Sequence, residues 1–531
     1  MRALPLPGHP LLTCSAIRSL EARGLAATPE GTLMARAADA VADACASLLR
    51  TLPARTPVLA LAGPGNNGGD ALLAALRLAE RGWSVHAIAL PAARPRAADA
   101  ARARDAWDAG GRPLDGPDAL ERLLADRPLV VDGCFGIGLA RPLPEPVAAI
   151  ARRVAELGLA VVAVDVPSGL DADRGAVVGG AAATAFRADL TVTMIADKPG
   201  LHTGAGAALA GRVVVADLGL PSIGIVPEPF AAPADGPLPW GRLIDARSAA
   251  ALLPPPRDRD AHKGRFGDVL VLAGEPAMRG AATLAALGAQ AVGAGRIHVG
   301  IEGAAAPADP GRPELMSRAI DPAAAPGEAA LGPATALVVG CGLGRGTRAR
   351  ALIEAALAHP AALVLDADGL NGVAADGGLS ARLAARAASG RPSVLTPHPL
   401  EAARLLGIQT ADVQADRIGC AHRLAVATGA CAVLKGAGTV VALPDGTWSV
   451  NASGGPILSV AGTGDVLAGT IAGLLAAGLP AALAAAGGAW LHGAAGDALA
   501  ADPDWRGGVG LPASRLADAI RAVVNRPAGR S

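Results

Sequence analysis

The chain lacks the residues that mark several large classes of protein. Only 2% of its 531 residues are aromatic and none is tyrosine, a compositional bias that carries no functional message. Its six cysteines show no C-x-x-C spacing, so we expect neither a zinc site nor a disulfide framework. Each cysteine is interpreted as a small buried apolar side chain in a protein from a reducing compartment.

An excess of charge of either sign is also missing, since 47 Lys and Arg residues balance 47 Asp and Glu residues. No basic run or aromatic-basic patch occurs, which argues against a nucleic-acid partner. Small metabolites are therefore the expected partners.

A convincing membrane-spanning run is absent. The most apolar stretch, Val466 to Leu491, consists largely of Ala and Gly and is interrupted by Pro480. These residues bury too little apolar surface to drive insertion, so the stretch predicts paired buried helices and no membrane partner. The start, MRALPLPGHPLLTC, has one Arg and no clear small-residue cleavage site, which disfavours a signal peptide. We expect a soluble, cytoplasmic protein.

What is present is enough chain for two domains, because single cores stop growing at roughly 250 to 300 residues. Both halves alternate apolar strands with Ala-rich helices, a pattern typical of parallel sheets covered by helices. Prolines break the pattern from Leu220 to Arg242. We predict an α/β fold with two three-layer α/β/α domains, residues 1–225 and 243–531, joined by a Pro-rich linker, 226–242.

The segment NASGGPILSVAGTGDVLAG, Asn451 to Gly469, is the most informative one in the chain. It places Asp465 behind a Gly-Thr-Gly loop that opens an apolar helix, so backbone N–H groups and the positive helix end face a bound anion. An Asp there can accept a proton from an alcohol while the amides stabilise a phosphoryl group in transfer. Taken alone, the segment is equally consistent with a Gly-rich helix start and a capping Asp.

Three segments upstream also end predicted strands in polar or small residues: VLDADGLN from Val364, SVLTPHPLEAARLL from Ser393, and AVLKGAGTVVA from Ala432. An α/β fold places its site at such strand ends. Lys435 follows an apolar strand on a Gly-flanked turn, where it can meet phosphate as a point charge. His398 and Glu401 lie three residues apart at a helix start and can share one helical face.

These segments, together with HKGRFGDVLVLAG, RGAATLAALGAQAVGAGRIHV and VVGCGLGRG, resemble the ADP-dependent NAD(P)H-hydrate dehydratases, which are ribokinase-like. The segments follow the family order and cover essentially all of Arg257 to Val523. Two departures occur: Cys341 stands where a proline is usual, which a turn should tolerate, and Gly455 stands where an Asn is usual, which puts a substrate hydrogen bond in doubt.

This resemblance implies roles for residues of the carboxyl-terminal half. Asp465 is the expected catalytic base, and the amides of 462–464 form the anion hole. Glu401 is expected to help hold magnesium, which enters with the co-substrate ADP, through water. The residues that match contacts to the hydrated nicotinamide are Ala281, Gly342, His398 and Asp465. The residues that match contacts to ADP or AMP are Lys435, Gly436, Ala437, Gly438, Thr439 and Gly464.

The amino-terminal half carries a glycine loop of its own, in PVLALAGPGNNGGDALLAALRLAERG from Pro57 to Gly82. It matches G-x-G-x-x-G, but no Asp or Glu ends the second strand, so an ordinary dinucleotide oxidoreductase is a poor interpretation. Arg94 and Arg96 follow that strand, where they meet either a ribose phosphate or solvent.

The loop GNNGGD resembles the Rossmann-like NAD(P)H-hydrate epimerase domain, and so do VVDGCFGIGLARPL, VVAVDVPSGLDAD and ADLTVTMIADKPGLHTGAG, from about Ser15 to Leu220. The resemblance implies that Asp165 is a substrate-contacting, candidate catalytic carboxylate. It implies a potassium ion held by Asn67, Asp132 and Ser168. The other residues that match substrate contacts are Asn66, Asn67, Gly68, Gly69, Asp70, Gly136, Ile137, Gly138, Leu139, Ala140, Arg141 and Pro142.

The two resemblances imply one function: repair of hydrated NADH and NADPH by epimerisation of the R and S hydrates and ADP-dependent dehydration of the S hydrate, with release of AMP and phosphate. We expect a homo-oligomer. An alternative is a ribokinase-like kinase for a small alcohol fused to a non-catalytic Rossmann-like binding module. The sequence leaves open whether epimerisation proceeds by ring opening or by loss and return of water.

Overall fold

The computed structural model describes residues 6–91, 97–220, 236–254, 257–302, 309, 311–321, 323, 326–505 and 508–526. The chain divides into two compact units, one of Pro10–Ala231 and one of Met1–His9 with Ala232–Ser531. Arg94 and Arg96, and most of the predicted linker, lie outside the described residues.

The amino-terminal unit is built on a six-stranded sheet in the order β3-β2-β4-β5-β6-β7, in which every pair of neighbours is parallel. Its strands are β2 (Val58–Ala62), β3 (Val85–Ala89), β4 (Leu129–Gly133), β5 (Val161–Val164), β6 (Leu190–Met194) and β7 (Arg212–Ala216). Its helices are α1 (Cys14–Ala27), α2 (Thr32–Leu49), α3 (Asn66–Glu80), α4 (Ala98–Ala109), α5 (Leu120–Ala125), α6 (Glu145–Glu156) and α7 (Gly206–Leu209).

Helices cover both faces of this sheet. Alternate strand residues such as Leu59, Leu61 and Val130 pack against apolar residues of α5 and α6 on one face. On the other face α3 contacts β2, β3 and β4, and α2 contacts β5 and β6. The strands are apolar throughout because both sides are buried. The predicted Rossmann-like three-layer fold of this half is confirmed.

The second sheet is ordered β1-β8-β17-β16-β15-β14-β13-β12-β9-β10-β11, and its strands numbered β8 to β17 lie in the carboxyl-terminal unit. Along this order from β8 to β11, neighbouring strands are parallel except β15 with β16 and β16 with β17. The strands are β1 (His9–Leu12), β8 (Trp240–Ile244), β9 (Asp268–Leu272), β10 (Arg296–Glu302), β11 (Met316–Ile320), β12 (Ala336–Val339), β13 (Ala362–Leu365), β14 (Ser393–Leu395), β15 (Cys431–Leu434), β16 (Val440–Ala442) and β17 (Trp448–Asn451).

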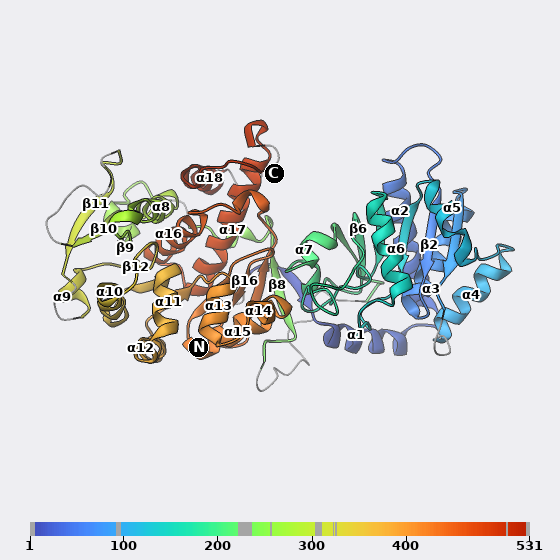
Figure 1. The fold of residues 1–531 in the computed structure, drawn as a ribbon, viewed down its shortest axis with the longest axis horizontal. Coiled ribbons are helices and arrows are strands. Elements are labelled where there is room, and N and C mark those ends of the chain that lie inside the picture. Colours follow the sequence, from blue (N-terminus) through green and yellow to red (C-terminus); the bar gives the residue numbers. More distant parts are fainter. Residues whose placement is uncertain are drawn as a thin grey trace. The chain divides into compact units, whose positions relative to one another are not determined.

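The helices of this unit also form two layers, which Figure 1 shows above and below the sheet. The layer of α8, α16, α17 and α18 packs on one face, and α10, α11 and α12 pack on the other. Their bounds, with those of the remaining helices, are α8 (Arg279–Ala291), α9 (Glu328–Leu331), α10 (Thr347–Ala358), α11 (Ala367–Ala375), α12 (Gly377–Ala388), α13 (Pro399–Leu406), α14 (Thr410–Ala415), α15 (Arg417–Thr428), α16 (Thr463–Ala476), α17 (Ala481–Ala500) and α18 (Ala513–Val524).

The small residues of α16 allow it to pack very closely on α8. A Cβ on Gly469 would lie 1.8 Å from the carbonyl oxygen of Ala285, and a Cβ on Gly288 would lie 2.2 Å from that of Val466. The apolar stretch from Val466 is thus two buried helices, α16 and α17, as predicted. Among the described residues, none of the helices combines the length and apolar character that a bilayer span requires.

The predicted linker, 226–242, overlaps β8, which begins at Trp240 and pairs in parallel with β17, where Arg242 lies opposite Ser449. Just before β8, the Leu238 carbonyl accepts a hydrogen bond from the indole of Trp448 at 2.8 Å. Pro239 directly precedes the strand, a position where proline is tolerated, so its presence did not exclude a strand here. The segment up to His9 groups with the carboxyl-terminal unit, and the domain bounds 1–225 and 243–531 stay a prediction.

Candidate active sites

The glycine loop after β2 brings the carboxyl ends of β2 and β4 into direct backbone contact. A Cβ on Gly63 would lie 1.8 Å from the carbonyl oxygen of Cys134, and a Cβ on Gly68 would lie 2.0 Å from that of Gly63. Larger residues cannot be placed at either position. The loop therefore fixes where α3 begins, and with it the positions of Asn66, Asn67 and Asp70.

Asp132 and Ser168 lie together beneath this loop, and both are fully buried. The Asp132 carboxylate accepts hydrogen bonds from the Ser168 hydroxyl at 2.6 Å, the Ser168 backbone at 2.7 Å and the Cys134 backbone at 3.2 Å. Burial raises the pKa of Asp132, and these hydrogen bonds oppose the shift. Nearby, the Asn67 side-chain nitrogen is buried without a hydrogen-bond partner.

Asp165 follows β5 in a left-handed backbone conformation, with φ of 66°, that a non-glycine residue seldom adopts. Its Oδ1 accepts a hydrogen bond from the Met194 backbone at 3.0 Å and one from the Lys198 ammonium at 2.7 Å. Ile195, beside it, has φ of 70°. Backbone strain of this kind is concentrated at functional sites, where the surrounding structure holds it in place.

Asp165 opens into a cavity of about 430 Å³ that collects many of the predicted epimerase residues. Those that line it are Asn66, Asn67, Asp70, Gly136, Ile137, Gly138, Leu139 and Asp165. The other predicted residues do not line it: Asp132, Ser168, Gly68 and Gly69 are buried behind it, and Ala140, Arg141 and Pro142 are exposed. Acidic residues that sequence reasoning did not single out, Glu21 and Asp99, also line the cavity.

In the carboxyl-terminal unit, Asp465 is the third residue of α16. Gly462 precedes the helix with φ of 92°, which allows the chain to turn directly into the first helical residue. The Thr463 hydroxyl donates to the carbonyl of Leu458 or Val460, each at 3.0 Å, and the Thr463 carbonyl contacts His492 Nε2 at 2.9 Å. Burial lowers the pKa of His492 to about 4, so the ring is neutral at pH 7 and donates this bond.

Asp465 lies against Asp366 and Cys341, and single side-chain atoms of the three all lie within 4.8 Å of one another. Burial and the charge of Asp366 raise the pKa of Asp465 to about 6, while a hydrogen bond from the Cys341 thiol opposes the shift. A carboxyl group with this pKa is mostly ionised at pH 7, yet basic enough to take a proton from a substrate.

Lys435 supplies the positive charge of this site. Its Nζ lies 2.7 Å from Asp366 Oδ1, and a Cβ on Gly464 would lie 3.3 Å from the same nitrogen. Burial disfavours the charged ammonium, but Asp366 and Glu401 outweigh that effect and raise the pKa of Lys435. The cation therefore stands at the amino terminus of α16, where backbone N–H groups also point.

The segment Lys435 to Thr439 connects β15 to β16 as a tight turn. Gly436 and Gly438 have φ of 138° and 59°, conformations that favour glycine. The guanidinium of Arg417, which is almost fully buried, donates to the Leu434 carbonyl at 3.1 Å and to the Lys435 carbonyl at 3.2 Å. The predicted nucleotide segment is thus a rigid turn directly beside Gly464.

His398 and Glu401 form a helix cap. The His398 backbone N–H donates to Glu401 Oε2 at 2.8 Å, and His398 Nδ1 accepts from the Leu400 and Glu401 backbones at 3.1 and 3.4 Å. His398 is half-exposed, whereas Glu401 is buried. The pair does more than share a helical face, because together they fix the start of α13.

Gly342 and Ala281, both predicted substrate contacts, lie next to each other. A Cβ on Gly342 would lie 3.3 Å from Ala281 Cβ and 2.7 Å from Met278 Cβ. In the same loop, a Cβ on Gly340 would lie 1.9 Å from the Asp366 carbonyl oxygen. The loop that follows β12 therefore packs against the start of α11, next to Asp366.

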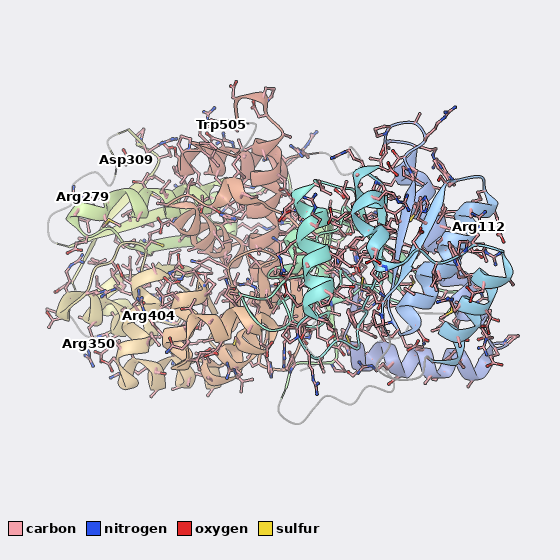
Figure 2. All side chains as sticks on the ribbon, turned by 45° about the vertical axis from the view of Figure 1, so that its right-hand side comes forward. Arg112, Arg279, Asp309, Arg350, Arg404 and Trp505 are labelled. Atoms are coloured by element: carbon pink, nitrogen blue, oxygen red, sulfur yellow. The ribbon has the colours of Figure 1, made fainter. Side chains whose placement is uncertain are left out.

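Beyond Gly342 the loop lines a cavity of about 780 Å³ beside α10, α11 and α12. Three arginines line it, Arg345, Arg350 and Arg404, of which Figure 2 labels the last two. Arg404 donates to the Asn371 side chain at 2.7 Å, and Arg350 pairs with Asp376 at 2.7 Å.

Comparisons with known proteins follow this division into two units. Residues 269–521 match the family described as NAD(P)H-hydrate dehydratase, and residues 30–200 match the one described as YjeF-related protein N-terminus. The bifunctional NAD(P)H-hydrate repair enzyme of Coxiella burnetii is 36% identical over 93% of this chain and 95% of its own length. The chain belongs to the family of bifunctional NAD(P)H-hydrate repair enzymes.

Another bifunctional NAD(P)H-hydrate repair enzyme and one solved structure are also similar to this chain. The Escherichia coli enzyme is 33% identical over 93% of this chain and 89% of its own length. Among solved structures, the ADP/ATP-dependent NAD(P)H-hydrate dehydratase of Bacillus subtilis is 32% identical, with a TM-score of 0.45, over 52% of this chain and 95% of its own length.

Both departures from the repair-enzyme pattern can be located in the structure. Cys341 is buried like the other five cysteines, all of which are free, as predicted, but its thiol also reaches Asp465. Gly455 is extended, and a Cβ there would have nothing within 4 Å. The backbone at this position does not need glycine, so an Asn side chain fits.

Sequence reasoning did not single out Asp366, His492 or Lys198. Asp366 directly follows β13 in the segment VLDADGLN, and this strand-end position was the signal available. His492 lies within a long Ala-rich helix and carried no local signal. Lys198 lies in the quoted stretch ADLTVTMIADKPGLHTGAG, 33 positions after Asp165, and its partner could not be identified from spacing.

Proposed function

We propose that the chain restores hydrated NADH and NADPH in two steps, one in each unit. The amino-terminal unit interconverts the R and S hydrates, and the carboxyl-terminal unit dehydrates the S hydrate with ADP, releasing AMP and phosphate. The observation that carries the proposal is the position of Asp465, a carboxylate with a pKa of about 6 at the start of α16, beside Lys435.

Dehydration needs help because hydroxide is a poor leaving group. The terminal phosphoryl group of ADP is transferred to the ring hydroxyl, phosphate then leaves with the C–O electron pair, and the adjacent carbon loses a proton to restore the double bond. In this scheme Asp465 takes the hydroxyl proton. Lys435 and the amides of Gly462 to Gly464 stabilise charge on the phosphoryl group.

Substrate placement follows the loops around Asp465. Gly342 and Ala281 offer a close-packed surface for the nicotinamide ring, and His398 presents a half-exposed imidazole from the start of α13. The turn from Lys435 to Thr439 holds the nucleotide. We assign the remainder of the dinucleotide to the cavity of about 780 Å³, where arginines can meet its phosphates.

Magnesium held through water by Glu401 is compatible with the hydrogen bonds of the cap. Oε2 accepts from the His398 backbone at 2.8 Å, but Oε1 makes only a 3.4 Å contact with His398 Nε2. Oε1 therefore keeps the capacity to accept a hydrogen bond from a metal-bound water. A bound magnesium ion would offset negative charge on the nucleotide phosphates.

Potassium fits the buried oxygen atoms at Asp132. Among the described residues, no Lys, Arg or His side chain pairs with this buried carboxylate, which favours a cation nearby. Ser168, the Phe135 carbonyl and the Asn67 side-chain oxygen, which faces Gly136, would add oxygen ligands without further charge. With no cysteine or histidine ligand predicted, a transition metal is disfavoured. Potassium, compared with sodium, should raise the melting temperature of the wild type and not that of Asp132→Asn.

The alternative, a small-alcohol kinase fused to a silent binding module, has less support because relatives named as bifunctional repair enzymes match across both halves. A cytoplasmic location and a homo-oligomeric assembly stay predictions from the sequence.

The proposed function is tested by incubating purified protein with mixed hydrate epimers, ADP and magnesium. We expect the nicotinamide absorbance to return in full, together with AMP and phosphate. Product formation that does not require ADP, or phosphorylation of an unrelated small alcohol at a higher rate than hydrate dehydration, would overturn it.

A further inference from the structure

The cavity of the amino-terminal unit contains a carboxylate that is firmly paired with a cation. The Lys198 side chain has no solvent exposure. Its Nζ lies 2.7 Å from Asp165 Oδ1, 2.6 Å from the Thr193 hydroxyl and 3.1 Å from the Met194 carbonyl. Three or more acceptors around one nitrogen use all three N–H groups of an ammonium. The buried ammonium therefore holds Asp165 Oδ1 in one position.

Asp70 lines the same cavity but, unlike Asp165, has no cation as a partner in the part of the chain that the structure describes. It is 9% exposed, and among the described residues no basic side chain pairs with it. Burial, and then the negative charges of Asp165, Glu21 and Asp99, raise its pKa well above the usual value. A carboxyl group whose pKa is raised keeps its proton to higher pH than usual, which suits a proton donor.

The charged groups of the neighbouring helices do not change this difference between Asp165, which is paired with a cation, and Asp70, which is not paired with one among the described residues. On α1, burial and Asp165 raise the pKa of Glu21, while Lys198 and Arg18 oppose the shift. On α4, Asp99 is paired with Arg102, which also contacts Glu30. A control for Asp70 has to lie outside the cavity, and Asp105 of α4 is exposed and does not line it.

We infer that Asp70 is the proton donor and Asp165 the proton acceptor of epimerisation, with Lys198 as the positioning residue that holds the Asp165 carboxylate. The inference rests on the proposed function and adds the direction of proton transfer. Asp70 comes from the start of α3 and Asp165 from the end of β5, so the two carboxyl groups reach the cavity from different elements.

The proton transfers by Asp70 and Asp165 balance if epimerisation proceeds by loss and return of water. Asp70 gives its proton to the ring hydroxyl, the C–O bond breaks with its electron pair on the departing water, and the ring nitrogen stabilises the cation. Water then adds to the opposite face as Asp165 takes one of its protons. A proton passes back from Asp165 to Asp70 through solvent. Ring opening would likewise need one donor and one acceptor.

The first test replaces Asp70 by Asn in the full chain and measures exchange between the R and S epimers over pH. The substitution keeps the side-chain shape, and loss of a general acid typically lowers the rate by about 10²- to 10⁴-fold. In the wild type the rate should fall at high pH as Asp70 loses its proton, and this fall should disappear in Asp70→Asn. Asp105→Asn, a change at an exposed residue of α4 that does not line the cavity, should keep both the rate and the fall.

The second test concerns Lys198. Lys198→Met removes the group that holds Asp165 Oδ1, so kcat for epimerisation should fall while KM stays near the wild-type value. Lys198→Arg should restore much of the wild-type kcat. Dehydration of the S epimer with ADP, measured in the same samples, shows whether the carboxyl-terminal unit of each full chain is folded and binds ADP.

Wild-type protein that does not interconvert the epimers would overturn the proposed function itself. Wild-type interconversion with a near-normal rate in Asp70→Asn, or an equal loss of rate in Asp70→Asn and Asp105→Asn, would overturn this inference alone. If Lys198→Met does not fold, the pH profile of Asp70→Asn still decides it: an unchanged high-pH limb in Asp70→Asn contradicts the inference.

Discussion

At the scale of single residues, the account depends most on Asp465. Asp465→Asn removes the base while keeping the side-chain shape, so dehydration should fall by about 10²- to 10⁴-fold. Epimerisation should be unchanged, because Asp165 and Asp70 lie in the other unit. In the wild type, dehydration should decline as pH falls through about 6, since the base must be ionised. Both rates are measured over pH; near-normal dehydration by the variant would remove Asp465 from the mechanism.

Cys341 gives a finer test of the same carboxyl group. Its thiol hydrogen bond lowers the pKa of Asp465, so Cys341→Ala should raise that pKa. A hydrogen bond of about 1 kcal/mol corresponds to roughly 0.7 pH units. The low-pH limb of dehydration should move upward by about that amount, while Cys431→Ala, a buried cysteine away from the site, should leave it in place. A limb that stays fixed in Cys341→Ala would contradict the thiol contact.

At the scale of elements, the contact between α8 and α16 determines the position of α16, the helix that carries Asp465. Gly469→Ala would place a methyl group 1.8 Å from the Ala285 carbonyl oxygen, so the helices must move apart. Overpacking of this kind costs about 1–3 kcal/mol. Denaturant unfolding should show that loss, with Gly455→Ala as the control because nothing lies within 4 Å of its Cβ. Equal stability of the two variants would contradict the packing argument.

The same scale shows what the sequence was able to predict. Strand and helix periodicity, and the loop that opens α16, are local patterns, so the α/β fold and the position of Asp465 followed from them. The contact between Lys435 and Asp366 joins residues 69 positions apart and depends on the order of β13, β14 and β15. Spacing alone does not give that order. Likewise, the polar residues of the segment from Ser393 did not reveal that His398 caps α13.

At the scale of the whole molecule, the structure places one candidate site in each of two units, and the account predicts that the two activities are separable within one intact chain. A shortened chain is a poor test, because a fragment starting at Asp245 would lose β8 from the carboxyl-terminal sheet. Variants of the full chain avoid this problem.

The most direct measurement follows both epimers during incubation of the full chain with ADP and magnesium, under conditions where spontaneous epimerisation is slow. The wild type should consume both epimers completely. Asp165→Asn should consume the S epimer at the wild-type rate and leave the R epimer behind. Complete consumption of both epimers by Asp165→Asn, or loss of S-epimer dehydration in that variant, would contradict the account.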